Sequence, residues 1–334
     1  MKPSRLLLPL VPLYRSALAL RELRLRTGME PVRRLRYPVV SIGNLSTGGS
    51  GKTPLTIALA RLLSGKGLHV DVLARGYGRQ SRVATRVNPA GTAVEFGDEP
   101  LLITRAAGVP VFVAPERYEA GLLAEAESPP ADQDSPSMVH LLDDGFQHRQ
   151  LAREFDILLF DQHDWRDRLL PAGNLREPLK AARRASVIAI PVGELEAELR
   201  SWGWRGPVWR LRRTMETPAV NGPIAAFCGI ARPEPFFAGL EAAGLRLAAR
   251  FAYPDHHPYS VADVDHLANA AQSAGAVALV TTEKDLVRLE KFSAAFPPSL
   301  PLLAARLTIE IEDPSTALDW LIDRVRTAPA HPKL

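Results

Sequence analysis

Cysteine is almost absent from this sequence, since the 334 residues include only Cys228. One cysteine excludes an internal disulfide and leaves too few thiolates for a cysteine-built metal site. Such sparing use is typical of proteins kept in a reducing cytoplasm. Because Cys228 lies in the apolar stretch IAAFCGI, we expect it to be a small buried residue of a strand.

Long apolar runs are also missing near the N-terminus. The run 6–13 is far shorter than the roughly 20 residues of a spanning helix, and Pro9 and Pro12 interrupt it. Three interpretations are open: a secretory signal, a helix that packs on its own domain, or a helix in the membrane interface. We favour the third, with leucines inserted and arginines facing anionic headgroups.

An excess of positive charge is found only in the N-terminal segment. Residues 1–36 carry nine lysines and arginines against two glutamates, whereas the rest carries 32 basic and 35 acidic residues. The basic character of the chain is therefore local, and we predict no nucleic-acid partner.

From residue 37 onward, apolar β-rich runs alternate with helical patterns such as 54–64. This alternation predicts an α/β domain with a mainly parallel sheet. The pattern changes near residue 208, and a second α/β run begins at 224–230 and ends in an amphipathic helix at 315–326. The runs predicted as strands in the first part are 38–42, 69–74, 111–114, 138–142, 156–160 and 186–190.

The stretch STGGSGKTP, which begins at Ser46, is typical of a phosphate-binding loop between a strand and a helix. In such a P-loop, backbone N–H groups surround the phosphates, Lys52 reaches the β- and γ-phosphates, and the Thr53 hydroxyl binds Mg²⁺. The strict consensus has glycine at position 46, so Ser46 departs from it, and a chance glycine turn is the alternative. The nucleotide-binding residues that we predict are Ser46, Thr47, Gly48, Gly49, Ser50, Gly51, Lys52 and Thr53.

An apolar run ends in Asp143 and Asp144, in the stretch MVHLLDDGFQH. A carboxylate at the carboxyl end of a strand is what a Mg²⁺ site next to a P-loop requires. Either residue could instead cap or turn the chain. We predict Thr53, Asp143 and Asp144 as metal ligands, and leave open which aspartate touches the metal.

Three further motifs contain charged residues next to glycine or proline. In LARGYGR, Arg75 and Arg79 are either contacts for an anionic acceptor or solvated arginines of a turn. In GDEP, Asp98 precedes a helix, where an acidic residue commonly serves as a cap. In NLREPL, Arg176 and Glu177 are compatible with a site loop or with an ordinary ion pair.

The stretch PDHHPY holds His256 and His257, and a metal pair there lacks an evident third ligand. In VTTEKDL, Lys284 follows a strand, at the end where α/β sheets tend to bind ligands.

Taken in order, these motifs resemble those of the tetraacyldisaccharide 4′-kinases, the lipid A 4′-kinases. The similarity runs from about residue 37 to 289, through SIGNLSTGGSGKTP, LARGYGR, GDEP, LLDDGFQH, LLPAGNLREPL, CGIARPEPF, DHHPY and TTEKDL. That family also carries a hydroxyl residue at the position of Ser46. The resemblance implies transfer of the γ-phosphate of ATP to the 4′-hydroxyl of a tetraacylated glucosamine disaccharide 1-phosphate. It also implies the cytoplasmic face of a Gram-negative inner membrane.

The resemblance implies roles for individual residues. Asp98 matches the carboxylate that acts as general base, His256 its partner, and Lys52 the catalytic lysine of the loop. His257 has no such match and is expected to be a loop residue. The family usually has proline in place of Asn174, so the contacts of that loop are left open. The substrate-binding candidates are Arg75, Arg79, Arg176 and Glu177.

With this resemblance, we predict two α/β/α domains joined by a β-ribbon. The predicted segments are a membrane-interface segment 1–36, a P-loop kinase domain 37–207, a ribbon 208–222 and a smaller α/β domain 223–334. The alternatives are a P-loop NTPase that acts in a maturation step and a nucleotide-gated membrane-binding module.

Overall fold

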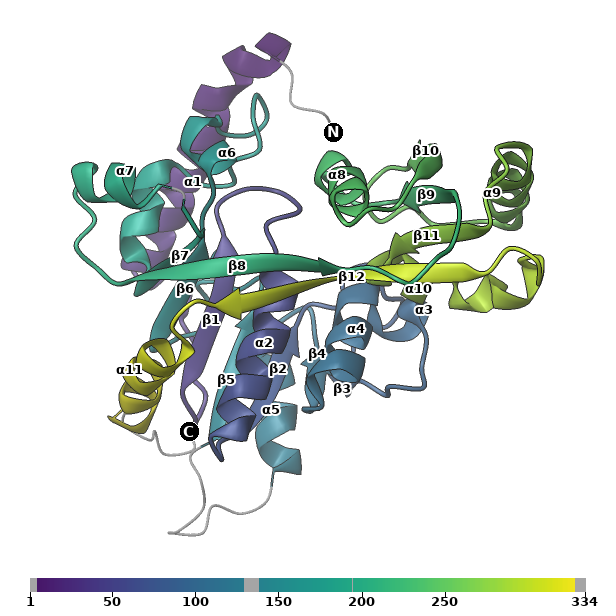
Figure 1. The fold of residues 1–334 in the computed structure, drawn as a ribbon. Coiled ribbons are helices and arrows are strands. Elements are labelled where there is room, and N and C mark those ends of the chain that lie inside the picture. The colour runs from purple at the N-terminus through teal and green to yellow at the C-terminus, as the bar shows by residue number, and fades with distance from the viewer. Residues whose placement is uncertain (1–4, 129–137, 194, 328–334) are drawn as a thin grey trace.

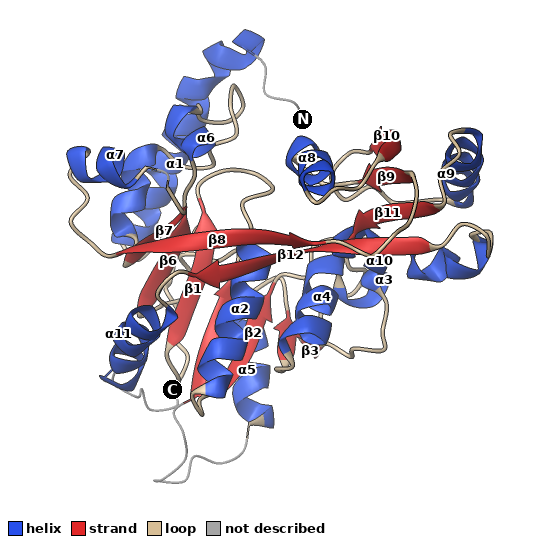
Figure 2. Cartoon of the chain, viewed as in Figure 1, coloured by secondary structure: helices blue, strands red, loops and turns tan. Residues whose placement is uncertain are grey.

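The computed structural model describes residues 5–128, 138–193 and 195–327. The ends of the predicted segments 1–36 and 223–334 therefore lie partly outside the described residues. Twelve strands form one continuous sheet in the order β10-β9-β11-β12-β8-β7-β6-β1-β5-β2-β4-β3 (Figures 1 and 2).

The first half of the sheet is centred on β1 (Val39–Asn44), which lies between β5 (Met138–Asp143) and β6 (Phe155–Leu159). These strands are parallel, and every residue of β1 is buried, as expected for a parallel strand covered on both faces. The predicted strands of this half are all confirmed. The others are β2 (His69–Ala74), β4 (Val111–Val113) and β7 (Val187–Pro191), with the short antiparallel β3 (Thr85–Arg86) at the edge.

Helices cover both faces of this half. In Figure 1, α11 (Pro314–Thr327), α2 (Lys52–Gly65) and α4 (Asp98–Ala107) stand side by side in front of it, and their buried side chains share one core with β1 and β5. The opposite face packs on α5 (Arg117–Glu127). The remaining short elements of this half are α3 (Ala93–Phe96), α6 (Gln162–Arg166), η2 (Leu179–Arg184) and α7 (Glu196–Ser201).

The second half of the sheet contains β9 (Ile224–Cys228), β10 (Leu247–Ala252) and β11 (Ala278–Thr282), which are parallel. Cys228 is fully buried on β9, as expected. Apolar clusters fill both faces of these strands. The helices of this half are α8 (Glu234–Ala242), α9 (Val261–Ser273), α10 (Glu283–Leu289) and η3 (Glu290–Ala295).

Two long strands join the halves. The first residues of β12 (Leu302–Ile311) pair in parallel with β11, and the later ones pair antiparallel with β8 (Val208–Glu216). The chain then returns to the first half, because α11 packs in the core of β1. The predicted range 223–334 thus contains parts that pack in both halves, and the domain boundaries stay a prediction.

The N-terminal segment forms η1 (Arg5–Leu10) and α1 (Val11–Arg26). In Figure 1 this segment extends past α6, and no residue of α1 is buried. Tyr14 and Leu18 pack on the cluster around β7, whereas Leu6 is 90% and Leu13 70% exposed. Among the described residues, no helix has the length and apolar character to span a membrane.

Candidate active site

The P-loop occupies the connection between Asn44 at the end of β1 and Lys52 at the start of α2. Its glycines have the positive φ angles that favour this residue type, +81° at Gly48 and +91° at Gly51. A Cβ added at Gly48 would lie 2.3 Å from the Cβ of Ala231, which follows β9. The loop therefore needs glycine both for its backbone and for the close approach of the second half.

The contacts of Ser46 explain why a serine stands where the consensus has glycine. It is fully buried, and its hydroxyl accepts a hydrogen bond from Asn44 Nδ2 at 3.1 Å. The carbonyl oxygen of the same amide accepts from Lys52 Nζ at 3.0 Å. The serine therefore orients the amide that positions the lysine.

Lys52 also approaches the acidic pair, with Nζ 3.5 Å from Asp144 Oδ1. Asp144 is held by two hydrogen bonds from the Arg176 guanidinium, at 2.8 and 3.0 Å, and its φ is +49°. Burial opposes its charge, but Lys52 and Arg176 outweigh burial and hold the pKa of Asp144 well below its usual value. Both of its oxygens thus have cationic partners.

Asp143 has a different environment. It is 4% exposed and accepts one hydrogen bond, from the Thr56 hydroxyl at 2.8 Å. Burial and the nearby charge of Glu99 raise its pKa to about 7. A carboxyl group with this environment would be stabilised as an anion by an added cation.

Asp98 and His256 come together although 158 positions separate them. Asp98 is the first residue of α4 and is 5% exposed, and its Oδ2 lies 3.1 Å from His256 Nδ1. Arg288 Nε is 3.3 Å from the same oxygen. Burial opposes the charge of Asp98, but the hydrogen bond from His256 and the charge of Lys284 lower its pKa.

Lys284 completes this network from the start of α10. Its Nζ lies 2.9 Å from Glu99 Oε1 and 3.1 Å from His256 Nε2. Burial acts against the charge of Lys284, but Glu99 and Asp98 raise its pKa. Its ammonium group is therefore the donor toward both Glu99 and His256. His256 Nε2 must then accept, which leaves the imidazole proton on Nδ1 to be donated to Asp98.

The LARGYGR loop lies against this network. The Tyr77 ring is 4.8 Å from the ring of His256, and Gly97, before Asp98, approaches the Tyr77 carbonyl. Both guanidinium NH₂ groups of Arg79 are buried and have no hydrogen-bond partner among the described residues. Arg79 can therefore receive an anion.

A second basic group was not predicted from the sequence. Arg117, at the start of α5, is buried, and burial together with the charge of Arg75 lowers its pKa to about 10. Burial and Arg117 also lower the pKa of His148 to about 3. Positive charge therefore accumulates near the acidic pair. An anion bound near Arg75 and Arg117 would relieve the repulsion between their charges.

The remaining predicted residues have the following surroundings. Glu177 accepts two hydrogen bonds from Arg184, which matches the ion-pair alternative. His257 stacks on Tyr253, with ring centroids 4.6 Å apart, as expected of a loop residue. Thr53 is half-buried in the first turn of α2.

Comparison with known proteins decides which family this site belongs to. The model of the LpxK family, described as tetraacyldisaccharide-1-P 4′-kinase, matches residues 3–326. The chain belongs to this family. A protein from Koribacter versatilis named tetraacyldisaccharide 4′-kinase is 41% identical over 94% of this chain and 97% of its own length. One of the same name from Anaeromyxobacter dehalogenans is 40% identical, over 84% and 80%.

The fold agrees with the family. The crystal structure of LpxK from Aquifex aeolicus in complex with ATP matches with a TM-score of 0.74 and 32% identity, over 96% of this chain and 98% of that one. The family membership confirms the resemblance drawn from the motifs, the α/β fold class and the assignment as an ATP-dependent kinase of lipid A biosynthesis. The alternatives of an NTPase and a binding module are not favoured.

Proposed function

We propose that this kinase transfers the γ-phosphate of ATP to the 4′-hydroxyl of a tetraacylated glucosamine disaccharide 1-phosphate, with Asp98 as the base. The observation that carries this proposal is the convergence of three groups at one place: the P-loop lysine, the acidic pair and the Asp98–His256 pair. The charge of Glu99, next to Asp98, acts on Asp143, so donor and acceptor chemistry share one electrostatic environment.

The donor phosphates would be held by residues 46–53, with Mg²⁺ bound by Thr53 and by an aspartate of the acidic pair. The fit is supported by the buried Ser50 hydroxyl, which has no hydrogen-bond partner among the described residues, and by the burial of Asp143. No group of three or more His, Cys, Asp or Glu forms a cage in the described ranges. This agrees with Mg²⁺, which usually takes one or two carboxylates together with substrate phosphates. When bound, the ion would neutralise charge on the transferring phosphate.

We assign Asp143, rather than Asp144, as the direct metal ligand. Asp144 already accepts hydrogen bonds from Arg176 and faces Lys52, so these two cations already balance the negative charge of its carboxylate. Asp143 has one neutral donor and lies next to another carboxylate. Arg176 and Lys52 would then hold Asp144 as a fixed anion that orients the lysine.

Asp98 would take the proton of the 4′-hydroxyl as that oxygen attacks the γ-phosphate. His256 donates to Asp98 Oδ2, and Lys284 fixes the histidine tautomer that makes this possible. The lowered pKa of Asp98 keeps it ionised at neutral pH, which a base requires. Because phosphoryl transfer needs positioning more than strong proton abstraction, a weak base suffices.

The anionic end of the acceptor would meet the arginines that lack carboxylate partners. Arg79 is supported by its NH₂ groups, which have no partner among the described residues, and Arg75 with Arg117 by the repulsion between their charges. Arg176 and Glu177 would shape the neighbouring loop through Asp144 and Arg184.

The acyl chains of the acceptor would stay in the bilayer, at the cytoplasmic face of the inner membrane of a Gram-negative cell. The exposed leucines of η1 and α1 and the arginines of α1 suit this interface. The Tyr14 hydroxyl donates to the Arg176 carbonyl at 2.8 Å, which connects α1 to the site loop. A membrane-bound α1 would therefore hold the site close to the lipid headgroup.

Purified protein should be incubated with Mg-ATP and tetraacyldisaccharide 1-phosphate in detergent, beside Lys52→Ala, and the lipid analysed by mass spectrometry. The proposal predicts a gain of one phosphate that the variant does not produce. Steady ADP release without any phosphorylated lipid would refute it and would indicate a hydrolase.

A further inference from the structure

The inner face of β8 leads from the core to the P-loop. Trp209 and Leu211 alternate with exposed arginines along this strand and are buried in the core shared by β1 and α2. Because successive side chains of a strand point to opposite faces, Arg213 lies on the same face as Leu211, at the edge of this core. Its Nη2 donates to the Ser50 carbonyl at 2.8 Å. Within the described ranges, no other side chain donates to a carbonyl of residues 46–53.

The strand paired with β8 contacts the same end of the loop. Ile309 of β12 is the direct cross-strand neighbour of Arg213. A Cβ added at Gly51 would lie 2.9 Å from Ile309 Cδ1 and 3.9 Å from Arg213 Nη2. This pair of side chains therefore borders one peptide link of the loop, with Ile309 next to Gly51 and Arg213 bonded to the carbonyl of Ser50.

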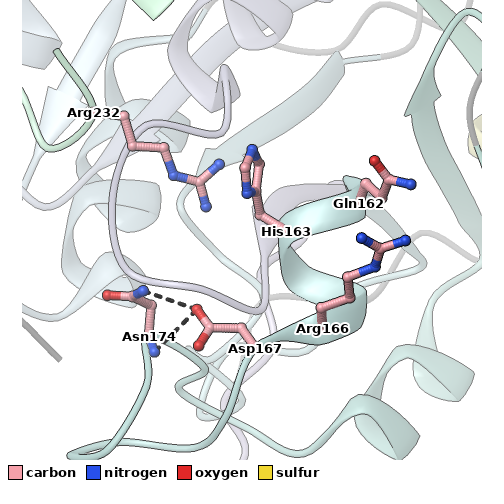
Figure 3. A pocket seen from close by; sticks show the side chains of 6 residues that line it. All are labelled: Gln162, His163, Arg166, Asp167, Asn174 and Arg232. Carbon is pink, nitrogen blue, oxygen red and sulfur yellow. Dashed lines mark hydrogen bonds between the residues drawn. The ribbon is translucent and has the colours of Figure 1, made fainter. Parts of the chain in front are cut away.

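A second arginine near the loop has a different partner. Arg232 lines a pocket of about 350 Å³ beside α6, together with Asn174 and residues of that helix (Figure 3). Its alkyl carbons approach the loop, since a Cβ added at Gly49 would lie 3.3 Å from its Cγ. Its Nη1, however, donates to the Asp161 carboxylate at 2.9 Å. Arg232 thus connects the second half to α6, whereas Arg213 holds the backbone of the loop itself.

The bond from Arg213 fixes the direction of the N–H group that follows Ser50. The Ser50–Gly51 peptide is trans. In a planar trans peptide the C=O and N–H bonds point in opposite directions, so the Gly51 N–H points away from the Arg213 guanidinium. This N–H has no hydrogen-bond acceptor among the described residues. A cation bound to the carbonyl also polarises the peptide and strengthens its N–H as a donor.

The Ser50–Gly51 peptide needs such an anchor. Gly51 has a φ of +91° and no side chain, so its own backbone does little to restrict rotation of this peptide. A P-loop binds phosphate through backbone N–H groups. A Ser50 carbonyl turned toward the phosphates would instead present its negative end to them. The ribbon therefore supplies the contact that keeps the carbonyl on the outside.

We propose that Arg213 is a positioning residue of the kinase, which holds the Ser50–Gly51 peptide in the orientation that binds the donor phosphates. This inference rests on the proposed function, because it takes residues 46–53 to bind the triphosphate. It adds to the loop a contact from β8, 163 positions away in the chain.

The test is calorimetric titration of the full chain with two probes, Mg-ATP and Mg-tripolyphosphate, which lacks the nucleoside. Arg213→Met keeps a long side chain and removes the donor, and it should raise the dissociation constants of both probes about tenfold. Arg213→Lys keeps a cationic donor and should bind both probes within about threefold of the original protein.

The matched control is Arg212→Met, which removes the same charge from the outer face of β8. The Arg212 side chain is 62% exposed, and its Nη2 lies 3.8 Å from Glu312 Oε1. It should bind both probes as the original protein does, because it makes no bond to the loop.

Steady-state kinetics with the lipid acceptor separates positioning of the donor from a general structural role. In Arg213→Met the KM for ATP should rise about tenfold, whereas kcat at saturating ATP and the KM for the acceptor should stay within about threefold. A general disturbance of the fold would lower kcat and weaken both substrates together.

The outcomes separate this inference from the proposed function. Unchanged binding of both probes by Arg213→Met, an equal loss in Arg213→Lys, or the same loss in Arg212→Met would overturn the role of Arg213 while the P-loop assignment stands. Binding of neither probe by the original protein would overturn the proposed function and this inference together.

Discussion

Replacing Asp98 with asparagine removes one negative charge from a 5%-exposed site and keeps the size of the side chain. The amide oxygen can still accept from His256, but it cannot take the proton of the attacking hydroxyl. General bases contribute about 10²–10⁴-fold to turnover, so we expect kcat to fall by that factor. None of the contacts of Asp98 involves the P-loop, so ATP affinity should change less than about threefold.

The variant should also lose some stability. Arg288 and Lys284 lose a buried anion, although Lys284 keeps Glu99. Losing one charged partner of a buried hydrogen bond lowers the free energy of unfolding by about 1–3 kcal/mol. We expect the variant to stay folded, because Lys284 keeps Glu99 and Arg288 keeps Asp285. Urea unfolding would measure this loss of stability and establish that the variant is folded.

Single-turnover phosphorylation, followed by mass spectrometry of the lipid, isolates the chemical step from product release. Asp265→Asn, on the exposed side of α9, is the matched control. Equal losses of kcat and of ATP affinity in Asp98→Asn would refute the assignment of Asp98 as base. Asp98→Ala should show the same separation with a larger loss of stability.

Three further predictions concern pH, the P-loop and the membrane. His140 lies buried on β5, where burial opposes its protonation but the carboxylates of Asp71 and Glu125 raise its pKa to about 9. The protonated histidine therefore stabilises the fold fully below the unfolded pKa of about 6.5, and this contribution is lost as pH rises through 9. Urea unfolding from pH 6 to 10 should show this fall, and His140→Gln should abolish it. Gly48→Ala should destabilise the fold by about 1–3 kcal/mol in the same assay, because its Cβ would meet Ala231 at positive φ, and an unchanged midpoint would contradict that. Deleting residues 1–26 should weaken both binding to anionic liposomes and activity on embedded acceptor; unchanged liposome binding would leave α1 as a packing helix.

The local part of the active site could be predicted from the sequence, because short stretches decide it. The P-loop is recognisable from its glycines and Lys52, since only certain residues fit a tight loop between a strand and a helix. Asp143 and Asp144 follow an apolar run, which places them at a strand end. The alternation of apolar runs and helical patterns also predicted the parallel sheet, because each strand of such a sheet is buried on both faces.

Only the tertiary structure decided which distant residues meet. Glu99, the second carboxylate of GDEP, meets Lys284 only because α4 and α10 pack together. The buried Arg117 and the pocket beside α6 had no sequence signal, because arginines and short polar turns are common on surfaces. Periodicity and turn chemistry act over a few residues and so determine elements and loops, whereas a site made from residues 158 positions apart depends on how β12 and β8 join the two halves.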